Sequence, residues 1–219
     1  MNLFRKANSY FGMTFAPALA VVFLLALHNP AYGVTDFSAS LTGSQEFPPN
    51  GSLATGFATF TLNDAQTALT FQATIFGIDV TTTQTPGTTA DNLVAAHIHC
   101  CTPPGANAPV VWGFFGTPFN DINPNDSVVI PLLDGVGAAF SGKWDLPEGN
   151  GTTLAAQLPG IFAGNSYINF HTVAFPGGEI RGQITPVPEP GTVFLIGWGL
   201  AWLVLSGSRR NCRRSQPQE

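Results

Sequence analysis

The sequence predicts an all-β fold, a sandwich or barrel built from short strands and tight turns. The first reason is composition, because the 219 residues include 24 Gly, 18 Pro and 18 Phe but only 2 Met. Glycine and proline disfavour helices and supply turns, while aromatic and β-branched residues suit strands. The second reason is spacing, because apolar residues alternate over several short segments. Successive strands without intervening helices are typical of sandwiches and barrels.

The clearest pair of strands lies at residues 56–62 and 69–75. In each segment the alternate residues on one face are apolar and those on the other face are mostly polar. Residues 63–66, Asn-Asp-Ala-Gln, are typical of a turn. The two segments therefore predict a β-hairpin.

Six further strands and one short helix are expected along the rest of the domain. The strands are predicted at residues 93–99, 110–115, 128–133, 138–144, 167–173 and 179–185. Loops are expected at residues 81–91, 100–107 and 116–125. The helix is predicted at 154–162, where Pro159 should stop it because proline lacks a donor N–H. The last two strands should form a hairpin, since 174–178 carries a Pro-Gly-Gly turn.

The first 33 residues have the pattern of a secretory signal peptide with a signal helix. Arg5 and Lys6 precede an apolar run at 15–27, and Ala-Tyr-Gly at 31–33 offers small residues for cleavage before Val34. An uncleaved N-terminal anchor is the alternative, but the run is nearer the length of a signal peptide than of a membrane span. We expect export and cleavage by signal peptidase.

The C-terminal segment, residues 187–219, combines a proline-rich spacer, a hydrophobic helix and a basic tail. The run at 192–207 is uncharged and somewhat short for a membrane span. Arginines after such a run hold that end on the cytoplasmic side. The domain at 34–186 should then face outward, with the membrane reached only through the terminal segments. The basic residues are Arg209, Arg210, Arg213 and Arg214.

The domain at 34–186 is strongly acidic. It holds Lys143 and Arg181 against eleven Asp and Glu residues, which gives a net charge of −9, whereas the whole chain has −5. Nucleic-acid binding requires clustered cations, so no nucleic-acid partner is expected. Anionic membrane surfaces are disfavoured for the same reason.

Side chains alternate between the two faces of a strand, and this alternation groups the histidines of this domain. His97 and His99 lie two apart on one predicted strand, so they share a face opposite Ile98. The same alternation in the last two strands places further polar residues on outer faces, away from the core. These residues are Tyr167, Asn169, His171, Glu179 and Arg181. If the strands are neighbours, the residues form one exposed polar patch.

Three imidazoles on such a patch suggest a copper or zinc site at His97, His99 and His171. Three histidines fall short of a closed four-ligand zinc site. The structural alternative is that His171 only donates to a backbone carbonyl and that Glu179 and Arg181 form an ion pair.

The cysteines leave several alternatives. Cys100 and Cys101 are adjacent, and after export they meet an oxidising compartment. They can form a strained bond with each other, ligate a metal beside His99 or pair with another molecule. No nucleophile elbow, P-loop, His-Glu-x-x-His or nucleotide-binding motif occurs, so no catalytic residue is assigned.

The middle of the chain resembles the CHRD domain, first named from chordin. Four ordered motifs carry the resemblance over residues 36–185, and they begin at Leu41, Ala96, Tyr167 and Pro176. They read Leu-x-Gly-x-Gln-Glu-x-Pro-Pro, Ala-His-Ile-His, Tyr-Ile-Asn-Phe-His-Thr and Pro-Gly-Gly-Glu-Ile-Arg-Gly-Gln. The resemblance implies an immunoglobulin-like Greek-key barrel distantly similar to copper/zinc superoxide dismutases.

That similarity bears on the histidines. His97, His99 and His171 occupy places comparable to copper ligands of those dismutases, but no histidine lies between His99 and His171. The bridging ligand and the zinc subsite are therefore missing, which leaves a single-metal site.

The C-terminal segment resembles the PEP-CTERM sorting signal. Pro188, Glu189 and Pro190 precede the apolar run and the arginines in the order that this signal requires. The resemblance implies Gram-negative bacteria and an exosortase-type processing enzyme as partner. It implies a transient inner-membrane anchor with the domain in the periplasm, followed by delivery to the surface or matrix.

The first functional hypothesis is a noncatalytic surface or matrix domain of unknown ligand. The second is a single-metal binding or redox protein. The third is adhesion to exopolysaccharide, for which Trp112, Phe114 and Tyr167 would stack on sugars if exposed. In a Phe-rich sandwich, rings of this kind more often lie in the core.

Overall fold

A computed structural model describes residues 35–188, 197–199 and 202. The described residues form one nine-stranded antiparallel sheet, so the all-β prediction is confirmed. The predicted signal peptide at 1–33 lies outside the described residues, as do Glu189, Pro190, the four arginines and nearly all of the predicted hydrophobic helix. Within the described part of the chain, no helix combines the length and the hydropathy that a membrane span requires.

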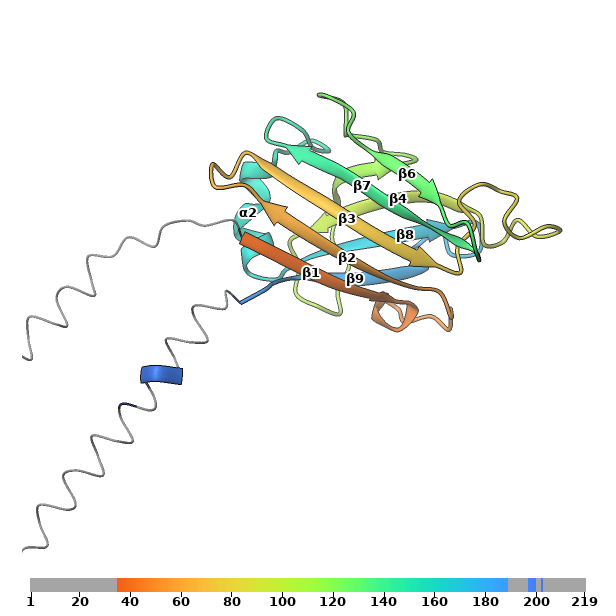
Figure 1. The fold of residues 1–219 in the computed structure, drawn as a ribbon, viewed down its shortest axis with the longest axis horizontal. Helices are drawn as coiled ribbons and strands as arrows, with labels where there is room; N and C mark the ends of the chain where they lie inside the picture. The colour runs from red at the N-terminus through yellow and green to blue at the C-terminus, as the bar shows by residue number, and fades with distance from the viewer. Residues whose placement is uncertain (1–34, 189–196, 200–201, 203–219) are drawn as a thin grey trace, which may run out of the picture. The chain divides into compact units, whose positions relative to one another are not determined.

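The sheet has the order β5-β4-β8-β9-β1-β2-β3-β7-β6 and curls into two layers. In Figure 1, β1, β2, β3, β7 and β6 form the front layer, while β9, β8 and β4 lie behind it. The strands are β1 (Thr35–Thr42), β2 (Thr55–Leu62), β3 (Ala68–Phe76), β4 (Leu93–Cys100), β5 (Val110–Phe115), β6 (Val128–Pro131), β7 (Gly137–Asp145), β8 (Ser166–Thr172) and β9 (Ile180–Pro186). A 3₁₀ turn, η1 (Gly43–Gln45), follows β1, and helix α2 (Leu154–Phe162) lies at one end of the sandwich.

The predicted strands are confirmed with small changes at their ends. β2 and β3 form the expected hairpin, and so do β8 and β9. β6 ends at Pro131, two residues earlier than predicted, and Glu179 precedes β9 instead of opening it. Pro159 does not stop α2, because its carbonyl still accepts from Ala163 N at 3.1 Å and the helix continues to Phe162.

β1 was absent from the predictions. Its residues alternate in the same manner as those of the other strands, with Phe37, Ala39 and Leu41 buried. The intervening residues are mostly Ser and Thr, and no turn residue marks the start of the segment after Val34. β1 joins the two halves of the sheet, because it pairs with β2 on one side and β9 on the other.

Aromatic side chains fill the space between the layers. Trp112 of β5 stacks on Trp144 of β7 with 5.7 Å between ring centroids, and Phe114 contacts Phe140 edge-on. Trp112 and Phe114 are fully buried, and Tyr167 is 2% exposed. The idea that these three rings stack on sugars at the surface is therefore wrong. The core alternative holds for Trp112 and Phe114, whereas Tyr167 is buried on the face of the sheet that carries His99.

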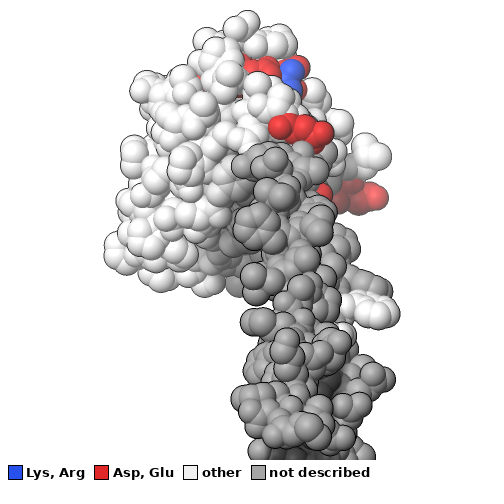
Figure 2. Space-filling view, turned by 90° about the vertical axis from the view of Figure 1, so that its left-hand side faces the viewer, with Lys and Arg blue, Asp and Glu red and all other residues white. Residues whose placement is uncertain are grey.

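The surface carries few cations. Lys143 lies between Asp126 and Asp145, with Nζ–carboxylate distances of 2.8 and 3.2 Å. The face shown in Figure 2 is mostly uncharged, and acidic atoms outnumber basic atoms among its described residues. This distribution agrees with the net negative charge of the domain.

Candidate metal centre

The histidines lie on β4 and β8, which are neighbours in the sheet. His97 is opposite Asn169 in the register of the two strands, and His99 is opposite Tyr167. On the next strand, Arg181 is opposite Asn169. The apolar residues between them point into the core, as pleat parity predicted. Ile98, Phe170 and Ile180 are at most 1% exposed.

The three imidazoles converge. One nitrogen from each of His97, His99 and His171 lies within 4.8 Å of the others. His97 Nδ1 is 3.3 Å from His171 Nε2, and the centroids of these two rings are 5.0 Å apart. Residues 74 positions apart in sequence thus meet at one point, as expected if the strands are neighbours.

The second nitrogen of each imidazole faces a backbone carbonyl from a different loop. His97 Nε2 is 3.1 Å from Thr117 O, and His99 Nδ1 is 2.8 Å from Ala108 O. A carbonyl only accepts, so each of these nitrogens carries the proton and donates. The remaining nitrogens, His97 Nδ1 and His99 Nε2, then present lone pairs.

His171 follows the same rule. Its Nδ1 donates to Pro176 O at 3.0 Å, which leaves a lone pair on Nε2. That Nε2 faces His97 Nδ1 and also Asn169 Oδ1 at 3.1 Å, which is a further acceptor. His99 Nε2 is buried and has no hydrogen-bond partner among the described residues.

Four acceptor atoms therefore point toward one another without a donor between them. Buried acceptors without donors are costly, and a cation in their midst removes that cost. Metal-bound histidines commonly donate their other N–H to a carbonyl, which fixes the tautomer and the ring orientation. The residues present thus fit a transition-metal ion such as copper or zinc.

Burial keeps the imidazoles neutral. Desolvation, followed by the nearby His171 and His99, lowers the pKa of His97 to about 4. Desolvation lowers the pKa of His99 to about 4 as well, although its hydrogen bond to Ala108 opposes the change. The pKa of His171 is also lowered by burial. Neutral imidazole is the form that binds metals.

The site is buried, whereas the sequence predicted an exposed patch. His97 is 4% exposed, and His99 and His171 are 8% exposed. The prediction took the outer face of the sheet to be solvent. Instead, loops cover this face, and three of them supply the carbonyls of Thr117, Ala108 and Pro176.

A stack of three side chains extends from the site across the sheet. The rings of His99 and Tyr167 are nearly parallel, with centroids 4.6 Å apart. Arg181 Cζ lies 3.4 Å from the centroid of the Tyr167 ring, a cation–π arrangement. The Tyr167 hydroxyl accepts from Ala108 N at 3.1 Å, so the stack also holds the loop that orients His99.

Glu179 does not pair with Arg181 as suggested. Its two carboxylate oxygens accept from Ser52 Oγ and Thr172 Oγ1, each at 2.6 Å. It therefore ties the residue before β9 to the end of β8 and to the segment before β2. Arg181 instead interacts electrostatically with Glu46.

Glu46 is a site residue that sequence reasoning missed. It is 5% exposed, and burial raises its pKa to about 7 against the opposing effects of Arg181 and Asn169. Its carboxylate packs against the backbone of Gly178 in the turn before β9. Its place in the Gln-Glu-x-Pro-Pro motif was the available signal, but nothing in the sequence connected that motif to the histidines.

The cysteines are resolved as a disulfide between Cys100 and Cys101. Of the alternatives, bonding between neighbours is therefore the one observed. In this state neither sulfur is a thiolate available to a metal beside His99.

Comparison with known families matches the chain to the model described as CHRD domain, over residues 37–184. No curated protein matches the chain significantly. No solved structure does so either.

Proposed function

This chain belongs to the CHRD domain family, and we propose that it is an exported member that holds one copper or zinc ion through His97, His99 and His171. The observation that carries the proposal is the convergence of three imidazole lone pairs within 4.8 Å of one another. Each imidazole is already oriented by a carbonyl. The proposed role is noncatalytic in the first instance, because the sequence carries none of the nucleophile or metalloprotease motifs considered above.

The donor set supports copper or zinc over magnesium or calcium. Imidazoles suit copper and zinc, whereas the harder cations require several oxygen ligands. Asn169 Oδ1 is a neutral oxygen at the edge of the same cluster. A bound zinc ion would stabilise the fold and act as a Lewis acid, whereas copper would add one-electron redox chemistry.

Export and surface delivery form the second half of the proposal. The signal-like segment at 1–33 supports secretion, and the sorting-like segment at 187–219 supports processing by an exosortase-type enzyme. A disulfide at Cys100–Cys101 fits an oxidising compartment. The domain would stay anchored in the periplasm before it reaches the cell surface or matrix.

The metal half is tested on protein exported from a bacterial host. Metal analysis should give one equivalent of copper or zinc per chain, and His97→Ala or His171→Ala should weaken metal binding by more than about tenfold. Thr117→Ala is the matched control, because Thr117 contacts His97 through its backbone carbonyl. The proposal fails if the folded wild-type chain binds neither metal after extraction and reloading.

The export half is tested separately by fractionation of the same host. We expect a product that begins near Val34 and appears in the periplasm or at the surface. A chain retained in the cytoplasm with its first 33 residues intact would contradict this half alone.

A further inference from the structure

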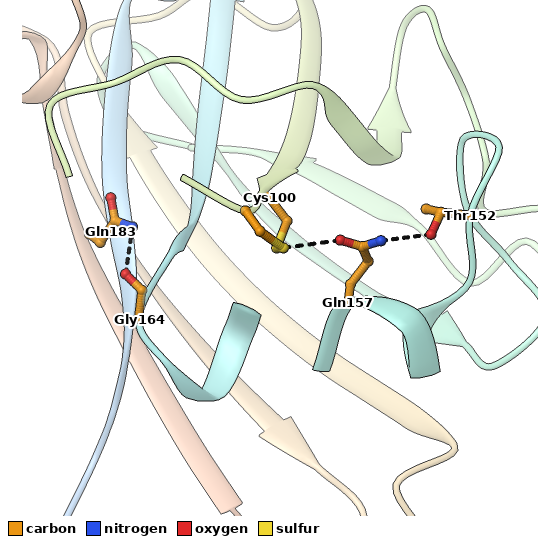
Figure 3. Close-up of a disulfide and its surroundings, with 6 residues drawn as sticks. Cys100, Thr152, Gln157, Gly164 and Gln183 are labelled. Atoms are coloured by element: carbon orange, nitrogen blue, oxygen red, sulfur yellow. Dashed lines mark hydrogen bonds between the residues drawn. A yellow bond between two sulfur atoms is a disulfide. The ribbon is translucent and has the colours of Figure 1, made fainter. Parts of the chain in front are cut away.

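The disulfide at the end of β4 lies directly after a predicted metal ligand. Cys100 closes the strand that carries His99, and Cys101 opens the loop at 101–109. Figure 3 shows the bond facing helix α2, with the Gln157 side chain directed from the helix toward the sulfur atoms.

This bond contributes little as a structural cross-link. A disulfide stabilises a fold chiefly by restricting the unfolded chain, and the effect grows with the number of residues enclosed. Cys100 and Cys101 are adjacent, so the enclosed loop is the shortest that a chain can form. A function other than cross-linking is therefore needed to account for it.

The two cysteine residues differ in exposure. Cys101 is exposed, whereas Cys100 is 2% exposed and belongs to the core. Both sulfurs pack on Gly160 of α2, where an added side chain would have no room. Of the two residues, Cys101 is thus the one that an external thiol meets at the surface.

The surroundings of Cys101 suit a thiol. Gln157 Oε1 lies 3.2 Å from Cys101 Sγ, at hydrogen-bonding distance, yet a disulfide sulfur has no hydrogen to donate (Figure 3). In this orientation of the amide, Gln157 Nε2 donates to Thr152 Oγ1 at 2.7 Å. The acceptor is thus in place for a Cys101 S–H that exists only after reduction.

The loop that begins at Cys101 orients His99. Near its end, Ala108 O accepts from His99 Nδ1 at 2.8 Å, and Ala108 N donates to the Tyr167 hydroxyl. Between these two points most of the loop is exposed. The loop is also held at Thr102, whose N–H donates to Asn165 O at 3.1 Å, and at Asn107, whose Nδ2 donates to Phe47 O at 2.8 Å. Freedom gained at Cys101 therefore acts chiefly on residues 103–106, which lie between these attachments.

We propose that Cys100–Cys101 is a thiol-exchange site for dithiol reductants, and that its reduction releases the 101–109 loop from His99. The second half rests on the proposed metal function, since release of the loop lowers the affinity of the metal site. The thiol exchange itself does not depend on a metal.

The reaction balances without any other reagent. One thiolate of the dithiol attacks Cys101 Sγ, forms a mixed disulfide and breaks the bond to Cys100, which leaves as a thiolate and takes up a proton. The second thiolate of the reductant then attacks the reductant's own sulfur in the mixed disulfide and releases Cys101. Cys101 takes up a proton and donates it to Gln157 Oε1 in a hydrogen bond. Two electrons and two protons pass from the dithiol to the cysteine pair.

The exchange is tested on the full chain equilibrated with reduced and oxidised dithiothreitol, trapped with an alkylating reagent and weighed by mass spectrometry. We expect the folded protein to gain two alkylated thiols on reduction, in addition to that of Cys212, which reacts in both states. Gln157→Leu should shift the equilibrium toward the disulfide by about threefold to tenfold, the value of one hydrogen bond. Gln72→Leu, an exposed glutamine on β3, should leave the equilibrium unchanged. A bond that reacts only after denaturation, or equal equilibria in both variants, would overturn the proposal.

Release of the loop is tested by amide hydrogen exchange and by metal affinity. Reduction should speed exchange at residues 102–108, and after removal of the reductant it should weaken copper or zinc binding by about tenfold or more. Cys100→Ser/Cys101→Ser should match the reduced wild type and ignore dithiothreitol. If the loop responds but no metal binds in either state, the metal function fails and the exchange site stands. Unchanged loop exchange and metal affinity on reduction would refute the coupling.

Discussion

Replacing Glu46 by Gln tests whether the pKa of this buried carboxylate beside the candidate metal centre is raised. Glu46 is almost fully buried beside Arg181 and Asn169, and burial raises its pKa from 4.5 to about 7. Glutamine keeps nearly the same shape but carries no charge at any pH. The substitution therefore removes one titration while it retains most of the packing.

The magnitude follows from proton linkage. Below pH 4.5 Glu46 is protonated in both the folded and the unfolded chain, so it adds nothing to the pH dependence. As the pH rises from 4.5 to 7, the unfolded chain releases this proton and the folded chain keeps it, so the wild type loses stability. At about 1.4 kcal/mol for each pH unit, the loss is about 3 kcal/mol above pH 7.

The assay is urea unfolding of the metal-free full chain and of Glu46→Gln between pH 4 and pH 8. The free energy of unfolding of the variant minus that of the wild type should rise by about 3 kcal/mol over this range. Any change in packing around the new amide shifts this difference equally at every pH. Histidine titrations occur in both proteins and cancel. A difference that stays constant with pH, or falls, would refute the assignment of Glu46 as a buried, partly protonated acid.

Three further outcomes are expected in unfolding experiments on the metal-free protein. Gly178→Ala should lower the free energy of unfolding by at least about 2 kcal/mol, because its φ of +127° is unfavourable for alanine and the new methyl meets the buried carboxylate of Glu46. Gly177→Ala is the control: nothing lies within 4 Å of the added methyl, so stability should change by less than about 0.5 kcal/mol. Glu148→Gln should cost about 2–4 kcal/mol, because the carboxylate accepts from one indole and three backbone N–H groups. As the pH falls from 6.5 to 4, His97 and His99 should each lower the free energy of unfolding by up to about 3 kcal/mol, because the unfolded chain takes up protons that the buried imidazoles do not. Replacing either histidine by Gln should make that decline shallower.

The sequence was sufficient for eight of the nine strands and for the grouping of the three histidines, because both follow from local periodicity. Alternation placed Ile98 and Phe170 in the core and the histidines on the opposite face. It required only one assumption about long-range structure, that the strands are neighbours, and the pairing of β4 with β8 satisfies it.

The sequence was not sufficient for what covers the site. The alternation of residues along a strand tells which face of the sheet a side chain lies on, but not whether that face is exposed to solvent. The loops that cover a face have no periodic sequence pattern from which their position could be predicted. Glu46 illustrates this limit, because it lies in a loop 51 residues before His97 and reaches the site only through the fold. The stacking of Arg181 on Tyr167 could not be predicted either, because Glu179 was closer to Arg181 in the sequence and was a chemically reasonable ion-pair partner.

The burial itself strengthens the case for a metal. Three imidazoles at a surface can turn their lone pairs to water, and a sandwich without a ligand would gain by leaving them there. Here each ring has its proton fixed on the far side by a carbonyl of Thr117, Ala108 or Pro176, so no rotation supplies a donor to the centre. A fold that covers such a cluster with loops places acceptors against acceptors, which is unfavourable without a cation. Copper or zinc at this point would account both for the cluster and for its cover, and the proposed thiol exchange would then reach the site through the 101–109 loop.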